Sequence, residues 1–212
     1  MSGLTERFVE IVTRLETEYG DAPSLLSYRS AFELLIAVIL SAQTTDDSVN
    51  ATLPSLFSRF PDAHRLAEAE AVDVEEIIHP LGFYRQKTRS IIGTARALVA
   101  EHGGAVPDTM EALVGLPGVG RKSAGVVLLH IYGTPAIIVD THFGRVVRRL
   151  SFSAEKDPVK LERDVAAILP REHWNDASMR LNYHGRKYCF ARKPDCQRCP
   201  VAYLCPSAGR EI

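Results

Sequence analysis

Apolar residues recur along most of the chain at the spacing of one face of an α-helix. The clearest case lies near the start, where Phe8, Ile11 and Leu15 fall on one side of a helix predicted for residues 4–19. Residues 30–40 are apolar almost throughout, which predicts a helix buried on all sides. The same pattern predicts further helices over residues 49–60, 65–71, 74–79, 87–102, 110–114, 122–132, 141–150 and 158–169.

Strand signals are nearly absent from the sequence. The one run rich in β-branched residues covers residues 136–139, which is shorter than a usual strand and has no partner run nearby. We interpret this run as a buried extended connector. The expected fold class is therefore all-α, with short connections between packed helices.

The chain has the composition of a protein that folds around its own core. With 212 residues, of which 46% are hydrophobic, it can bury a substantial apolar interior. The first residues are polar and show no export signal, and the longest apolar run, residues 34–40, is too short to cross a bilayer. We expect a soluble, cytoplasmic monomer with no membrane partner.

Charge is distributed unevenly between the two halves of the chain. Residues 1–110 hold nine Lys and Arg against 16 Asp and Glu, whereas residues 111–212 hold 16 against ten. A basic half of this kind suits a polyanionic partner such as nucleic acid. A dipolar surface without any partner is the alternative.

A glycine-rich segment, LPGVGRK at residues 116–122, separates two of the predicted helices. Gly118 and Gly120 permit a tight turn whose backbone N–H groups face outward at the positive end of the next helix, next to the cation of Arg121. Such a turn binds phosphate without regard to base sequence. An ordinary helix–turn–helix corner is the alternative.

Lys122 stands in the first turn of the helix that follows this segment, beside Arg121. A positive charge is unfavourable at the N-terminal end of a helix and also next to another cation. A lysine that gives up its proton is a nucleophile toward an electrophilic sugar carbon. A lysine that only contacts phosphate is the alternative interpretation.

Asp140 directly follows the buried run 136–139 and stands at the predicted N-cap of the next helix. Capping alone would explain an aspartate there. A carboxylate in this position could also stabilise a cationic sugar transition state or accept a proton from a nucleophile. The two interpretations are compatible.

All four cysteines fall near the end of the chain, with the spacing C-x6-C-x2-C-x5-C. They are Cys189, Cys196, Cys199 and Cys205. In a reducing compartment such a group favours metal binding over disulfides, and four thiolates suit either zinc or a [4Fe–4S] cluster. The basic residues that would present this loop to a DNA backbone are Arg186, Lys187, Arg192, Lys193 and Arg198.

Taken together, these motifs resemble the endonuclease III family of helix-hairpin-helix DNA glycosylases. The similarity is carried by LPGVGRKSA at 116–124, VDTH at 139–142, HGR at 184–186 and the cysteine spacing, and it extends to LSAQTTD at 40–46 and LGFYRQK at 81–87.

The resemblance implies two modules and a cofactor. Residues 23–135 would form a helical barrel that contains the helix-hairpin-helix. Residues 1–22 and 136–212 would form a second helical module, with a [4Fe–4S] cluster in the loop 189–205. The activity implied is that of a bifunctional glycosylase/AP lyase of base excision repair. It would act on double-stranded DNA with oxidised pyrimidines or abasic sites, at the nucleoid if the organism is a prokaryote.

The resemblance also implies roles for individual residues. Lys122 matches the Schiff-base lysine and Asp140 the catalytic aspartate, and the four cysteines match the cluster ligands. Gln43 matches the residue that fills the gap left by the extruded nucleotide, while Leu81 and Phe83 belong to the loop that holds the duplex open. Asp46 and His142 are candidates for the pocket of the damaged base.

Three positions depart from the family pattern. Phe83 stands where an aliphatic residue is usual, and Gly125 and Gly144 replace larger residues. The shape of the lesion pocket and the treatment of the orphan base therefore stay open.

Two other interpretations fit part of the pattern. An adenine-excising mismatch glycosylase shares the fold, but that branch usually lacks the hairpin lysine and carries a further C-terminal domain, whereas this chain has Lys122 and ends seven residues after Cys205. A non-catalytic helix-hairpin-helix module with structural zinc would not need the combination of Lys122 and Asp140.

Overall fold

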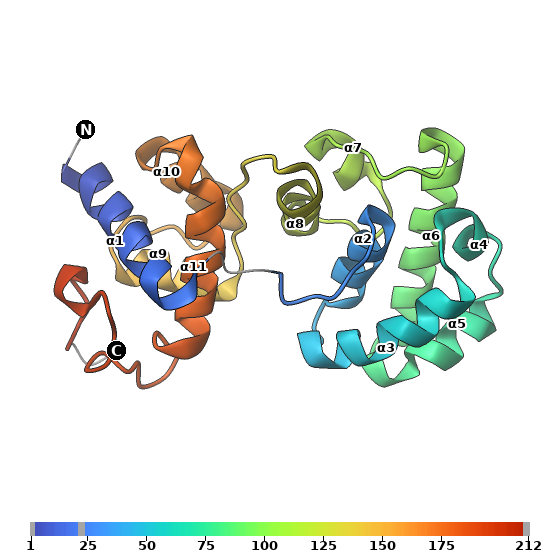
Figure 1. Cartoon of the computed structure of the whole chain (residues 1–212), viewed down its shortest axis with the longest axis horizontal. Coiled ribbons are helices and arrows are strands. Elements are labelled where there is room, and N and C mark those ends of the chain that lie inside the picture. Colours follow the sequence, from blue (N-terminus) through green and yellow to red (C-terminus); the bar gives the residue numbers. More distant parts are fainter. Residues whose placement is uncertain (1–2, 21–23, 210–212) are drawn as a thin grey trace. The chain divides into compact units, whose positions relative to one another are not determined.

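The computed structural model describes residues 3–20 and 24–209 (Figure 1). The regular structure of these residues is entirely helical, which confirms the predicted all-α class. No described helix is both long and apolar enough to cross a membrane. By internal contacts the chain divides into two compact units, residues 24–134 and residues 1–23 with 135–212. The predicted module border between residues 22 and 23 lies outside the described residues.

The unit of residues 24–134 is built around one fully buried helix, α2 (Ala31–Leu40). Every residue of α2 after Ala31 is buried, as a sequence that is apolar apart from Glu33 predicts. The start of α2 is fixed by Ser30, whose hydroxyl accepts the N–H of Glu33, while the Glu33 carboxylate accepts the backbone N–H of Arg29. The helices of this unit besides α2 are α3 (Asp46–Arg59), α4 (Ala63–Ala67), α5 (Ala71–Ile78), the 3-10 helix η1 (His79–Leu81), α6 (Tyr84–His102), α7 (Met110–Gly115) and α8 (Arg121–Tyr132).

The second unit combines the two ends of the chain. Its helices are α1 (Gly3–Tyr19), α9 (Thr141–Arg149), α10 (Pro158–Ile168), the 3-10 helix η2 (Arg171–His173), α11 (Trp174–Lys187) and the 3-10 helix η3 (Ala202–Leu204). Phe8 of α1 stacks on Phe152 with 3.9 Å between ring centroids. Arg7 lies over the same ring and donates hydrogen bonds to the carbonyls of Leu150 (2.8 Å) and Leu204 (2.9 Å). Packing and hydrogen bonds therefore attach the first helix to the last segments of the sequence.

Helix α11 is the one long helix that the hydrophobic pattern did not predict. Its buried face carries Ser178, Arg180 and His184 beside apolar Leu181, so the helical periodicity is hidden by polar residues. Each polar group there has a partner; Arg180, for example, donates to the carbonyl of Val12 at 3.1 Å. The buried polar side chains of this helix therefore hold the unit together through hydrogen bonds to neighbouring segments.

The segment 136–139 is not a strand, which confirms its interpretation as a connector. Ala136, Ile137 and Ile138 are buried. Two side chains of α11 supply the hydrogen bonds that a neighbouring strand would otherwise provide: the amide oxygen of Asn175 accepts the N–H of Ala136 (3.0 Å), and the hydroxyl of Ser178 accepts the N–H of Ile138 (2.9 Å).

Replacing Ser178 by alanine should therefore destabilise the protein. The buried N–H of Ile138 would lose its acceptor, which costs about 1–3 kcal/mol. The measurement is the free energy of unfolding from denaturant titration. Ser55→Ala, at an exposed position inside α3, is the matched control and should change stability by less than about 0.5 kcal/mol. Equal stabilities for the two variants would contradict this account of the connector.

Candidate functional site

The glycine-rich segment forms a tight turn between α7 and α8, anchored from inside. Leu116 and Val119 are buried, whereas Gly118 and Gly120 are exposed. Gly118 has a φ of +77°, and a Cβ there would lie 2.7 Å from Cβ of Ser90, so only glycine fits. The turn thus exposes its backbone while its apolar side chains fix it to the core.

Lys122 lies in the first turn of α8, directly after this turn. Its side chain is exposed, as is that of Arg121, while Ala124 and Gly125 face the core behind them. The N-cap of α8 is Gly120, which has no side chain to cap the helix. The helix start thus lacks the capping hydrogen bond that an N-cap side chain usually supplies to the first backbone N–H groups.

Asp140 caps the N-terminus of α9 in the second unit. Its Oδ1 accepts the N–H of Phe143 at 2.7 Å, and its Oδ2 accepts the side-chain amide of Asn182 on α11. Asn182 in turn accepts a hydrogen bond from Nε of Arg186 at 3.0 Å. The carboxylate is thus held in one orientation through both of its oxygens, with the guanidinium of Arg186 behind the amide.

Asn182 is a site residue that no sequence motif marks. A single asparagine inside a helix carries no motif of its own, and its value depends on α11 lying against the start of α9. The spacing of four residues to Arg186 was the only available signal, because residues four apart in a helix lie on one face.

His142 lies in the first turn of α9 and is half-buried. Its Nδ1 is 3.2 Å from Nη2 of Arg145, and burial lowers the pKa of the imidazole. Gly185 of the HGR motif permits the close approach of α11, since a Cβ there would lie 2.8 Å from Cβ of His142. The glycine of that motif therefore has a packing reason. The other candidate pocket residue, Asp46, begins α3 in the first unit and is also half-buried.

Two exposed side chains in the first unit stand on unusual backbone. Gln43 has a φ of 54°, and Phe83 has a φ of 47° with its side chain 65% exposed. A residue other than glycine in the left-handed region costs on the order of 1–3 kcal/mol. The surrounding structure must therefore hold both loop tips in place.

Leu81 corrects one detail of the sequence prediction. Its side chain was expected to face DNA together with Phe83, but it is only 3% exposed and belongs to the core of its unit. Gly82, which separates the buried Leu81 from the exposed Phe83, has a φ of 65°, a conformation that favours glycine. Only Phe83 of this pair is available for contact with a ligand.

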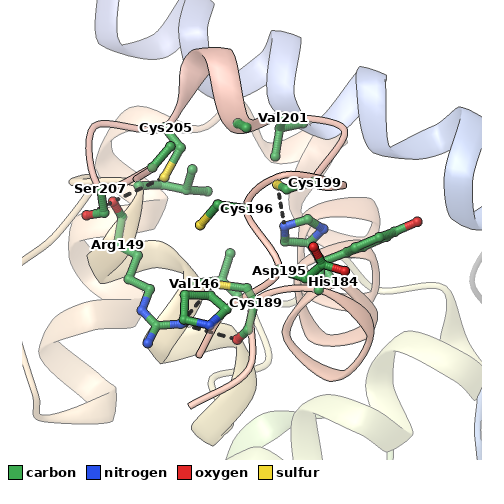
Figure 2. Close-up of a pocket in the computed structure, with 15 residues that line it drawn as sticks. Val146, Arg149, His184, Cys189, Asp195, Cys196, Cys199, Val201, Cys205 and Ser207 are labelled. Carbon is green, nitrogen blue, oxygen red and sulfur yellow. Dashed lines mark hydrogen bonds between the residues drawn. The ribbon is translucent and has the colours of Figure 1, made fainter. Parts of the chain in front are cut away.

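The four cysteines line one pocket in the second unit (Figure 2). They form no disulfide with one another. Among the described residues, no three His, Cys, Asp or Glu side chains gather around a single ion position. Burial raises the pKa of Cys199 to about 11 and also raises that of Cys205. Metal binding favours the thiolate form of such groups.

Two side chains reach the sulfurs from the walls of this pocket. Nη1 of Arg149 donates to Sγ of Cys189 at 3.2 Å, and Nε2 of His184 lies 3.4 Å from Sγ of Cys199. Burial lowers the pKa of His184 to about 4, and the Tyr19 hydroxyl lies 3.1 Å from its Nδ1. A thiolate accepts hydrogen bonds only, so the donor set suits an anionic sulfur centre.

The basic residues around the cysteine loop differ in their availability. Arg192 and Lys193 are exposed, and Lys193 lies at a positive φ of 51°. Arg186 is exposed but bonded to Asn182, and Arg198 pairs with Asp195 at 3.6 Å.

Known protein families match both the region that contains Lys122 and Asp140 and the segment that contains the four cysteines. Residues 36–171 match the HhH-GPD superfamily of base excision DNA repair proteins, and residues 189–205 match the iron–sulfur binding domain of endonuclease III. Endonuclease III of Synechocystis is 45% identical over 98% of this chain and 95% of its own length. The Escherichia coli enzyme is 41% identical over 93% of both chains. A solved structure described as a trapped covalent intermediate of endonuclease III with DNA is 36% identical, covers 96% of both chains and has a TM-score of 0.91.

The chain belongs to the endonuclease III family. As a member of that family it is a bifunctional DNA glycosylase and AP lyase of base excision repair. The match over 189–205 decides between the two metals that four thiolates allow, and the cofactor is a [4Fe–4S] cluster. The identities decide against an adenine-specific mismatch glycosylase and against a non-catalytic zinc module.

For this enzyme we expect Cys199→Ala to lower the iron content. Removing one thiolate leaves a buried cluster without a full set of ligands, and metal binding is coupled to the folding of the loop. Iron and acid-labile sulfide per chain, together with the visible absorption spectrum, are the measurements. Ser207→Ala removes a non-cysteine side chain from the same pocket and is the matched control. Equal iron in the two variants, or stoichiometric zinc in anaerobically purified protein, would contradict the assignment.

Proposed function

We propose that this enzyme excises oxidised pyrimidines from duplex DNA and cleaves the strand 3′ to the resulting abasic site, with Lys122 as the nucleophile and Asp140 as the catalytic carboxylate. The observation that supports this most is the exposed Lys122 amine at a helix start without a side-chain cap. A relative described as a trapped covalent intermediate with DNA adds support for an enzyme-linked step.

In the proposed first step the Lys122 amine attacks C1′ of the damaged nucleotide. The bond from C1′ to the base breaks, and the base leaves with the bonding electron pair and takes up a proton. Asp140 bears the negative charge that stabilises the cationic sugar, and it accepts the proton released by the amine. Because both oxygens of Asp140 are held by N–H donors, the carboxylate is oriented before the reaction, and little free energy is needed to orient it in the transition state.

The second step uses the same covalent link. Once the sugar ring opens, Lys122 and C1′ share an imine, which withdraws electrons and makes the 2′ proton acidic. Loss of that proton forms a double bond between C2′ and C3′, and the bond from C3′ to the phosphate breaks. Water then hydrolyses the imine and releases Lys122.

We further propose which residues carry DNA. The exposed backbone of Gly118 and Gly120 with Arg121 would bind one phosphate group, and Arg192 and Lys193 would bind the backbone elsewhere. Gln43 and Phe83 would enter the duplex while the target base is extruded. Asp46 and His142 are the candidates for contact with the damaged base.

We propose that Cys189, Cys196, Cys199 and Cys205 ligate the cluster, with no role in bond breaking. The cluster would hold the loop that carries Arg192 and Lys193 in its folded form. These two cations would then lie near the anionic centre formed by the cluster and its thiolates. Arg149 and His184 would donate hydrogen bonds to two of its thiolates.

Lys122→Gln should abolish covalent trapping by borohydride while DNA binding persists. Glutamine keeps nearly the length and the hydrogen-bonding capacity of the side chain but cannot form an imine. Strand cleavage at a preformed abasic site is the second measurement and should also be lost. Arg121→Gln, the neighbouring exposed cation, is the control and should still be trapped. Full trapping in Lys122→Gln would move the nucleophile to another amine.

Asp140→Asn should lower base excision by about 100-fold or more, because the charge that stabilises the transition state is lost. Asp157→Asn is the matched control: Asp157 caps α10 in the same way, by accepting the N–H of Lys160 at 2.9 Å. We expect Asp140→Asn and Asp157→Asn to lose similar amounts of stability, whereas only Asp140→Asn should lose activity. If unfolding accounts for the lost activity, Asp140 is a cap and no more. On DNA that already lacks the base, the loss should be smaller, since no glycosidic bond remains to be broken.

A further inference from the structure

Lys87 is a buried cation that none of the steps above employs. It lies in the first turn of α6 and is 5% exposed. Its ammonium donates to the carbonyl of Leu81 at 2.9 Å and to the hydroxyl of Thr44. Both partners are neutral oxygens, and burial lowers the pKa of the lysine. A buried ammonium with neutral partners is costly, so its retention calls for a reason beyond packing.

The three groups form a closed ring of hydrogen bonds. Thr44 Oγ1 donates to the carbonyl of Leu81 at 2.7 Å, so this carbonyl accepts from both Thr44 and Lys87. The hydroxyl accepts from the ammonium and donates to the carbonyl, and each atom therefore has a consistent role. The bond from Lys87 to Leu81 is buried and the two bonds of Thr44 are partly buried, and away from water such bonds are stronger than in water.

This ring joins two loops that are far apart in the sequence. Thr44 follows Gln43 directly in the loop between α2 and α3. Leu81 is the last residue of η1 and lies two residues before Phe83, which stands in the second loop, between η1 and α6. Lys87 also holds the second loop through its backbone, since its N–H donates to the carbonyl of Phe83 at 3.0 Å. Gln43 and Phe83, both with a left-handed backbone, are thus each one or two residues from the ring.

We propose that Lys87 and Thr44 are positioning residues that hold Gln43 and Phe83 in register, so that both side chains enter the DNA duplex as one unit. This rests on the proposed function of Gln43 and Phe83. The ring fixes the two loop backbones relative to each other, and it offsets the tendency of either loop to relax from its left-handed conformation. Breaking it leaves the fold intact but separates the motions of the two loops.

Thr44→Val and Lys87→Met are the test variants. Valine keeps the shape of threonine and removes the hydroxyl, and methionine keeps the apolar stem of lysine and removes the donors. Thr88→Val is the matched control, because Thr88 is fully buried on the same helix and its hydroxyl has no hydrogen-bond partner among the described residues. Thermal unfolding and circular dichroism verify folding, and Thr44→Val serves if Lys87→Met does not fold.

The first measurement needs no DNA. Hydrogen–deuterium exchange should become faster over residues 41–45 and 81–87 together in Thr44→Val, and stay unchanged in Thr88→Val. Faster exchange in only one loop would overturn the proposed coupling.

The second measurement is single-turnover excision of one lesion placed either in a paired duplex or in an unpaired bulge. Thr44→Val and Lys87→Met should lose at least about fivefold on the duplex, a coupling typical of residues in one network, and much less on the bulge. In a Gln43→Ala, Phe83→Ala background the same changes should add little further loss. An equal loss on both substrates, or full additivity, would mean that the ring only supports the fold and would overturn the proposal.

The single variants Gln43→Ala and Phe83→Ala separate the two levels of inference. If neither lowers excision from the duplex, their proposed role in opening DNA is wrong, and the positioning proposal is overturned with it. If both lower it while Thr44→Val and Lys87→Met behave like Thr88→Val, the role in opening DNA stands and only the ring is without function.

Discussion

The second unit depends on one constraint, which is that a buried backbone without regular structure must still have its N–H groups bonded. The connector of residues 136–139 is such a backbone, and it has no strand beside it. Helix α11 meets the constraint with Asn175 and Ser178, and one further turn along it places Asn182 on the carboxylate of Asp140. The face of α11 that supplies acceptors for the N–H groups of the connector therefore also orients the carboxylate of Asp140, the proposed catalytic group. Structural and chemical demands are met by a single helix.

The double use of α11 for packing and for orienting Asp140 also explains why the fold was predicted from the sequence more completely than the site. Helix α1 was predicted from the helical spacing of its apolar residues and α2 from its nearly continuous apolar run, because almost all buried positions of both helices carry apolar side chains. α11 was not, since half of its buried face is polar, and the short α4 was placed at residues 65–71 when it spans Ala63–Ala67. Asp62 caps α4 and fixes its start, a signal that outweighs the apolar spacing used for the prediction.

The candidate site was accessible from the sequence only where a motif carries its chemistry locally. The hairpin lysine, the capping aspartate and the cysteine spacing are features of this kind. Asn182 and the pair of Thr44 and Lys87 are not, because each acts on a residue that is distant in the sequence. Leu81 shows the converse error: a motif identified the loop, but the side chain that the loop exposes depends on the turn at Gly82, with its φ of 65°.

The attachment of α1 to the end of the chain has a consequence for synthesis. The core of residues 24–134 is complete when residue 134 has been made, because all of its members lie within that range. The apolar face of α1 emerges first, yet its core includes residues as late as Val201, and Arg7 waits for the carbonyl of Leu204. At about 5–20 residues per second, α1 spends on the order of ten seconds on the ribosome without its partners. The nascent chain thus carries the apolar residues of α1 without their core partners during this time, which is the kind of transiently exposed apolar surface that makes chaperones necessary.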